Sequence, residues 1–190
     1  MKKEYQKSKL AKISLTASFI ALGILSGYLL LFVPNVETMG LISFCAGIYL
    51  GYKRGLVVSI SIYGIIGLIN PLGASPLPVL TAQITGGCLY SLIGAMVSHR
   101  LLMIRDKKRT IIVSMALGFV LTLLYDILTN TAYYIIFGSP INFTVFLIGG
   151  LIFSSIHIIS NAILFGLFSL YLGKIKRLLG FFLTTNESLN

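Results

Sequence analysis

The acidic residues within the apolar part of this chain are the first candidates for chemistry. Glu37 lies between two apolar runs, and Asp126 lies inside a later one. Asp126 is ~24 Å from the basic end of its run at ~1.5 Å per residue, in the part farthest from the basic residues. An ionisable group at that depth is costly unless it faces a polar interior, which predicts a functional site.

Three polar residues share the helical face of Asp126. They follow it at spacings of three, four and seven residues, and they are Thr129, Asn130 and Tyr133. Such spacings place side chains on one side of a helix. The face predicts either one wall of a ligand site or an interhelical hydrogen-bond cluster that binds no ligand.

Gln83 and His157 are further polar candidates. Gln83 is expected at a depth similar to that of Asp126, where its amide offers both a donor and an acceptor, although a tie to a neighbouring helix is the alternative. His157 precedes Asn161 by one helical turn and has no paired acid nearby in the sequence. We therefore place His157 below the site as a packed polar residue, and expect His157→Ala to change affinity less than about threefold, well under 1.4 kcal/mol.

The composition is that of an integral membrane protein. Of the 190 residues, 56% are hydrophobic and 11% are charged, and the mean hydropathy is +0.94. These values exclude a water-soluble domain of this size. The formal net charge of +10 does not indicate nucleic acid as a partner, because no soluble basic domain is present to carry a binding surface.

The two cysteines, Cys45 and Cys88, lie inside apolar runs. They show no Cys-x-x-Cys spacing and have no pair of histidines nearby. We therefore predict neither a metal site nor a disulfide framework.

Six apolar runs predict an all-α integral membrane protein, because lipid offers the backbone no water to bond. We expect a single domain over 1–190 with transmembrane helices at about 12–33, 39–52, 55–70, 77–98, 110–137 and 143–173. The second and third are short for a full crossing. One helix over 39–70 would be ~48 Å long, however, which is too long for a hydrocarbon core of ~30 Å.

The basic residues give these helices an orientation. All 15 Lys and Arg residues precede the first run, follow the sixth, or lie between the second and third or the fourth and fifth. The other connections, 34–38, 71–76 and 138–142, contain none. By the positive-inside rule both termini are cytoplasmic, and Glu37 faces outside.

Small residues recur at four-residue spacing. Ala17 and Ala21 do so in the first run, and Gly47, Gly51 and Gly55 do so in the next two. Such spacing puts small side chains on one helical face, where a neighbouring backbone can approach closely. For the glycines we expect packing inside the bundle.

Signatures of catalysis are incomplete. The chain has no Gly-x-Ser-Gly serine, and His157 and Asn161 supply a His-x-x-x-Asn spacing without the paired glutamates of prenyl-protein proteases. No Gly-x-x-x-x-Gly-Lys-Ser/Thr phosphate loop is present either, so ATP hydrolysis would need partner subunits. We predict no enzymatic activity and no cofactor for this chain.

Several loose motifs cover the whole chain: the Ala17-x-x-x-Ala21 pattern, the Pro34-Asn35-Val36-Glu37 loop, the segment from Gly47 to Gly55 with its Lys53-Arg54 turn, and the stretch 70–83. Together with six helices and a basic amino terminus, they resemble the S component, the substrate-binding subunit, of energy-coupling-factor (ECF) vitamin transporters. The resemblance implies a subunit of an ABC-type importer in a prokaryotic cell membrane. Its partners would be a membrane coupling subunit and two ATP-binding subunits.

The resemblance also implies two surfaces. Ala17 and Ala21 would dock on the coupling subunit. A vitamin or related micronutrient would bind near the outer surface between the first loop, which adds Asn35, and helices four to six. Cobalamin-type, thiamine-related and nucleobase-like ligands remain open, and two carboxylates without outward basic residues permit a neutral or cationic one. The alternatives are a ligand-free membrane scaffold, or a small stand-alone carrier, for which a convincing internal repeat is missing.

Overall fold

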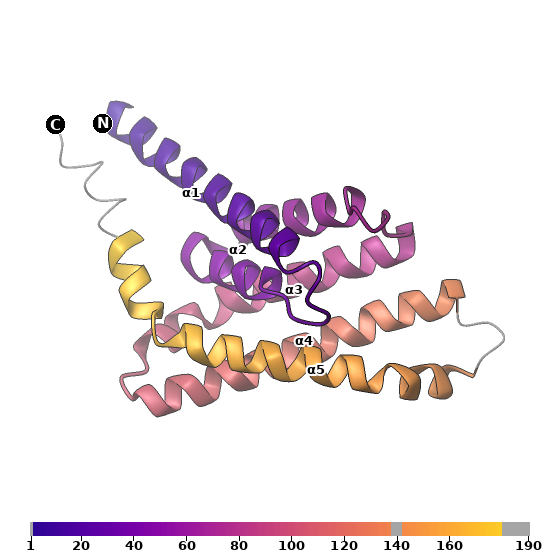
Figure 1. Ribbon diagram of the computed structural model, residues 1–190. Coiled ribbons are helices and arrows are strands. Elements are labelled where there is room, and N and C mark those ends of the chain that lie inside the picture. The colour runs from indigo at the N-terminus through magenta and orange to yellow at the C-terminus, as the bar shows by residue number, and fades with distance from the viewer. Residues whose placement is uncertain (1, 138–141, 180–190) are drawn as a thin grey trace.

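The computed structural model describes residues 2–137 and 142–179, and within them the chain is helical without any strand. Five long helices follow one another: α1 (Lys2–Leu29), α2 (Met39–Leu68), α3 (Leu77–Met103), α4 (Lys107–Phe137) and α5 (Phe143–Ser169) (Figure 1). A short helix covers 172–179. By length and composition, each of the 5 long helices can cross a membrane, α2 when it is counted over its whole length, as in a multi-pass membrane protein.

Helix α2 reverses direction at Gly51. The backbone there has φ 77° and ψ 174°, which is outside the helical region. A Cβ placed on Gly55 would lie 3.1 Å from the Cα of Gly47, whereas residues this far apart in a straight helix are separated by ~12 Å. α2 is therefore two limbs, 39–50 and 52–68, that fold back on each other.

The reversal corrects two of the sequence expectations. The break lies at Gly51 rather than at the Lys53-Arg54 turn, because glycine adopts a positive φ without steric cost. The glycines of this segment consequently do not share one helical face. The first limb is only ~18 Å long at ~1.5 Å per residue, which is short of a full membrane crossing.

The first limb of α2 forms the centre of the bundle. All of its residues from Gly40 to Ile48 are buried. Its backbone touches α3 at two glycines: a Cβ on Gly47 would lie 2.0 Å from the Ser91 carbonyl oxygen, and one on Gly94 would lie 2.2 Å from that of Phe44. Packing inside the bundle, expected for the glycines, is confirmed at Gly47.

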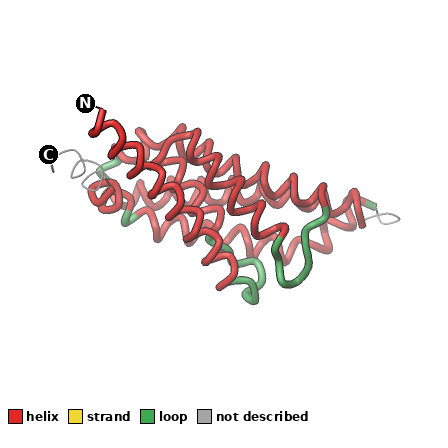
Figure 2. Tube along the Cα trace, turned by 90° about the horizontal axis from the view of Figure 1, so that it is seen from above, coloured by secondary structure: helices red, strands yellow, loops and turns green. Residues whose placement is uncertain are grey.

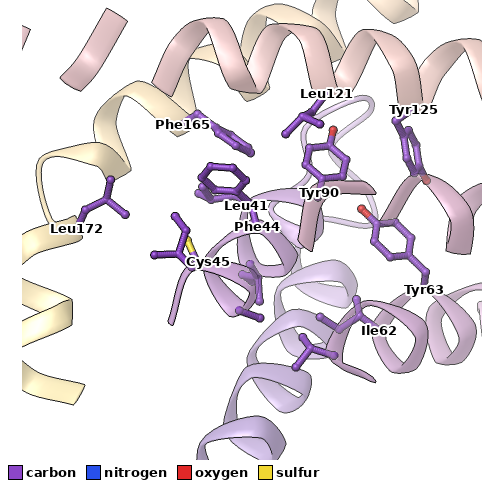
Figure 3. Packing of buried hydrophobic residues seen from close by; sticks show 14 of the residues in the cluster. Leu41, Phe44, Cys45, Ile62, Tyr63, Tyr90, Leu121, Tyr125, Phe165 and Leu172 are labelled. Carbon is purple, nitrogen blue, oxygen red and sulfur yellow. The ribbon is translucent and has the colours of Figure 1, made fainter. Parts of the chain in front are cut away.

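Aromatic rings connect this centre to α4 and α5. The ring centroid of Phe44 is 5.0 Å from that of Phe165, and Tyr90 lies 6.1 Å from Phe165 (Figure 3). Tyr90 in turn lies 6.3 Å from Tyr125, and Tyr125 lies 5.7 Å from Tyr63. The three tyrosines thus lead from the apolar core toward the middle of α4.

Helix α1 packs against α2 through small residues on one side only. A Cβ on Gly23 would lie 2.1 Å from the Ile62 side chain, and one on Gly27 would lie 3.0 Å from the Met39 sulfur. Ala17 and Ala21 are exposed on the helix surface. α1 ends at Leu29, before the predicted end at 33, and hydrogen-bonded turns follow it.

The two ends of the described chain lie together. The start of α1 and the helix over 172–179 are at the same end of the bundle (Figure 1). The view from above shows the helices running along the length of the molecule, with loops joining them (Figure 2). Which side of a membrane these ends face stays a prediction.

Candidate functional site

A cavity of about 430 Å³ lies where all five long helices approach the loop that follows α1. Its wall includes every residue that the sequence predicted for substrate binding: Asn35, Glu37, Gln83, Asp126, Thr129, Asn130 and Tyr133. The structure therefore brings together side chains from the first loop, α3 and α4. Their role in binding a substrate stays a prediction.

His157 also lines this cavity, and it joins the two acidic residues. Its Nδ1 lies 2.6 Å from Asp126 Oδ1, and its Nε2 lies 3.4 Å from Glu37 Oε1. Both Asp126 and His157 are 7% exposed. The sequence interpretation of His157, below the site and without a paired acid, is therefore wrong.

Asp126 and His157 meet because α4 and α5 run antiparallel to each other. Counted from the loop that joins α4 to α5, Asp126 lies ~17 Å from Phe137 and His157 lies ~21 Å from Phe143, at ~1.5 Å per residue. Two antiparallel neighbouring helices thus place the residues at nearly equal depth. The cavity therefore extends along α4 and α5 as far as the level of Asp126 and His157.

The loop over 30–38 is held against α5 and α2. The Ser160 hydroxyl donates to the Asn35 carbonyl oxygen at 3.0 Å, and the Tyr63 hydroxyl donates to Glu37 Oε1 at 3.4 Å. Asn35 has φ 58°, a left-handed conformation that asparagine tolerates better than most residues. The contact with Ser160 places the loop beside the middle of α5 (Figure 1).

Two polar atoms of the cluster formed by Glu37, Asp126 and His157 have no hydrogen-bond partner. They are Asp126 Oδ2 and His157 Nε2, both buried, and the 3.4 Å separation from Glu37 does not complete a hydrogen bond to the latter. Buried polar atoms in proteins are normally paired with protein or water. A molecule in the cavity that carries donors and acceptors can supply the missing partners.

The other predicted residues of α4 are partly occupied by internal contacts. The Thr129 hydroxyl donates to the carbonyl oxygens of Tyr125 and Asp126, at 3.0 and 3.3 Å. Asn130 Nδ2 donates to Ser154 Oγ at 3.2 Å. The interhelical hydrogen-bond cluster that the sequence left open is thus present, and it forms part of the cavity wall.

Sequence reasoning also missed several lining residues, among them Asn70, Phe153 and Ser154. Ser154 precedes His157 by three residues, a spacing that puts both on one helical face and could have indicated the site. Asn70 caps the turn after α2, where its Oδ1 accepts a hydrogen bond from the Leu72 amide at 2.9 Å.

Acidic side chains outnumber basic ones in the cavity wall. Glu37 and Asp126 are its acidic residues, and the described lining includes no lysine or arginine. Glu37 lies just before Met39, the first residue of α2, where the helix dipole favours a negative charge. Among the described residues, no group of three or more His, Cys, Asp or Glu side chains could hold a metal ion.

Comparisons of this chain with protein-family models, with curated proteins and with solved structures gave no match.

Proposed function

We propose that this chain is the substrate-binding membrane subunit of an ECF-type importer for a vitamin or related micronutrient. The observation that carries the proposal is the cavity itself, which is walled by polar side chains and contains unpaired buried atoms on Asp126 and His157. Left without a partner, each of these atoms costs ~1–3 kcal/mol, which a ligand or water in the cavity offsets. A bound ligand would supply the missing hydrogen-bond partners.

The volume of the cavity bears on the ligand. Small-molecule sites commonly measure roughly 300–1,000 Å³, and about 430 Å³ lies in the lower part of this range. Among the candidates raised by the sequence, this favours a thiamine-related or nucleobase-like compound over a much larger cobalamin-type one.

The exposed face of α1 supports the proposed assembly. Ala17 and Ala21 are exposed, while Gly23 and Gly27 of the same helix contact α2. A small-residue face that the bundle does not use is available for close approach of another helix in the membrane. The coupling subunit would dock there, and ATP hydrolysis would take place in the two ATP-binding subunits.

The test is a search for the ligand. The protein is purified gently in detergent, small molecules that remain bound are identified by mass spectrometry, and a panel of vitamins is screened for shifts in unfolding temperature. We expect one micronutrient to be retained and to raise the unfolding temperature. Absence of any retained molecule, together with no shift from any vitamin, would favour the scaffold.

A further inference from the structure

We infer that the ligand of this cavity is an unphosphorylated organic cation that is held by the carboxylate of Asp126. The inference rests on the proposed function and specifies its substrate. It depends on three observations: the charges of the wall, the state of Asp126, and the rings near it.

The first observation is the balance of charge. Two carboxylates, those of Glu37 and Asp126, line the cavity, against one imidazole, that of His157. With the imidazole protonated, the wall still carries one negative charge in excess. Buried charges require counter-charges, and a cationic ligand supplies one.

The second observation is the state of Asp126. Its Oδ1 is bound to His157 at 2.6 Å, whereas its Oδ2 is buried without a hydrogen-bond partner. The contact with His157 fixes the orientation of the carboxylate and leaves its other oxygen without a protein donor. Hydrogen bonds between ionised partners are roughly twice as strong as neutral ones.

The third observation concerns the aromatic and amide side chains. Rings from Tyr125, Tyr133 and Phe153 line the cavity together with the amides of Gln83 and Asn130. Aromatic faces attract cations and stack on planar rings. The amides can bind ring nitrogens or hydroxyl groups of the same molecule.

The wall is correspondingly unsuited to phosphate. Phosphate recognition in proteins commonly uses arginine or lysine, and the described lining contains neither. A phosphate group placed here would meet two carboxylates. The phosphorylated form of a substrate should therefore be rejected.

Matched pairs of probes test the inference. Binding of thiamine, choline and pyridoxamine to the purified full-length protein is measured by calorimetry, beside thiamine monophosphate, phosphocholine and pyridoxamine phosphate. Pyridoxine, which differs from pyridoxamine in its amine, serves as the neutral comparison. We expect a cation to bind at least ~10-fold more tightly than its phosphorylated or neutral counterpart, the ratio that corresponds to 1.4 kcal/mol.

Variants locate the interaction. Asp126→Asn should weaken binding of the cation ~10- to 100-fold, because a charge-assisted hydrogen bond is lost, and should weaken binding of a neutral probe less. Asp106→Asn, at an exposed position just before α4, is the matched control and should leave binding unchanged. Glu37→Gln, in the loop, provides a second charge removal if Asp126→Asn folds poorly.

The possible failures are distinguishable. Tighter binding of a phosphorylated, anionic or neutral probe than of every cation would overturn this inference and leave the proposed function standing. Equal loss of cation binding in Asp106→Asn and Asp126→Asn would also overturn it. If no probe binds and no small molecule is retained on purification, both proposals fail.

Discussion

At the residue scale, the cavity depends on one histidine between two acids. Glu37, Asp126 and His157 come from the first loop, α4 and α5, so their contacts join three separate segments. The 2.6 Å contact between Asp126 and His157 is buried. The cluster should therefore stabilise the protein as well as shape the site.

His157→Ala should lower both stability and affinity. The substitution leaves Asp126 buried without its partner, and an unsatisfied buried group costs ~1–3 kcal/mol or more when it is charged. Thermal unfolding of the ligand-free protein and binding of the retained ligand measure the two effects. His99→Ala, at an exposed position on α3, is the control and should change neither.

An unchanged unfolding temperature in His157→Ala would contradict the role given to the Asp126–His157 contact. If the affinity of His157→Ala stays within about threefold of the unaltered protein, well under the 1.4 kcal/mol of a tenfold change, His157 does not contribute to ligand binding.

Short-range sequence patterns predicted many of the residues that line this cavity. The remaining lining residues depend on contacts between helices, which those patterns do not specify. Asp126, Thr129, Asn130 and Tyr133 were found because helical periodicity fixes their common face. His157 was missed because its pairing with Asp126 depends on the register between α4 and α5, which helical periodicity does not specify.

At the element scale, the reversal of α2 is the feature that the sequence could indicate only in part. Length argued for two helices over 39–70, and the structure has two limbs. Three evenly spaced glycines, Gly47, Gly51 and Gly55, could each have formed the break. Tertiary packing selects among them, because Gly47 and Gly55 are needed for close contact.

Gly47→Ala should destabilise the bundle. The added Cβ would lie 2.0 Å from the backbone oxygen of Ser91, and backbone cannot move aside cheaply. Overpacking of this kind costs typically ~1–3 kcal/mol, which should lower the unfolding temperature in detergent.

Gly64→Ala provides the comparison within the same helix, since a Cβ there meets nothing within 4 Å. It should be neutral or slightly stabilising, because alanine has the higher helix propensity. Equal effects of the two substitutions would contradict the tight packing of the first limb.

Ala17→Leu and Ala21→Leu should weaken assembly with a coupling subunit while leaving ligand binding intact. Both positions are exposed on α1, so bulk added there separates partner helices without disturbing the cavity. Co-purification of the coupling and ATP-binding subunits measures the effect. Gly149→Leu, which adds bulk to an open position on α5, is the control and should retain the partners.

If both alanine variants co-purify with the partner subunits as well as the unaltered protein does, the exposed face of α1 contacts lipid and not the coupling subunit. Loss of partners in Gly149→Leu as well would show that added bulk anywhere on the surface disrupts the complex.

At the scale of the whole molecule, the sequence predicted the class of fold and an orientation. Hydropathy predicts membrane helices well because lipid permits few other backbone structures. The boundaries of α3 and α4 extend a few residues beyond their apolar runs, since helix continues through the basic segments at their ends. The two ends of the described chain lie at one end of the bundle, as two cytoplasmic termini require (Figure 1).

Cysteine labelling in intact cells tests the orientation. In a chain without Cys45 and Cys88, Ser75→Cys should react with an impermeant thiol reagent and Lys107→Cys should not. The reason is that the positive-inside rule predicts that connections without basic residues face outside. Ser139, in another of the three connections without basic residues, lies outside the described residues and offers a further labelling position. Labelling at position 107 would contradict the predicted topology.

The most direct test of the central claim uses two adjacent glycines of α5. Gly150 lines the cavity, Gly149 does not, and a Cβ at either position meets nothing within 4 Å. Gly150→Phe should therefore fill the cavity while every polar residue is kept, and Gly149→Phe should add the same ring outside it. The measurement is the amount of small molecule retained per chain, by mass spectrometry, when the two variants and the unaltered protein are purified in parallel. We expect a bound micronutrient in the unaltered protein and in Gly149→Phe, and little or none in Gly150→Phe. Equal retention by both variants, or none by the unaltered protein, would contradict ligand binding in this cavity.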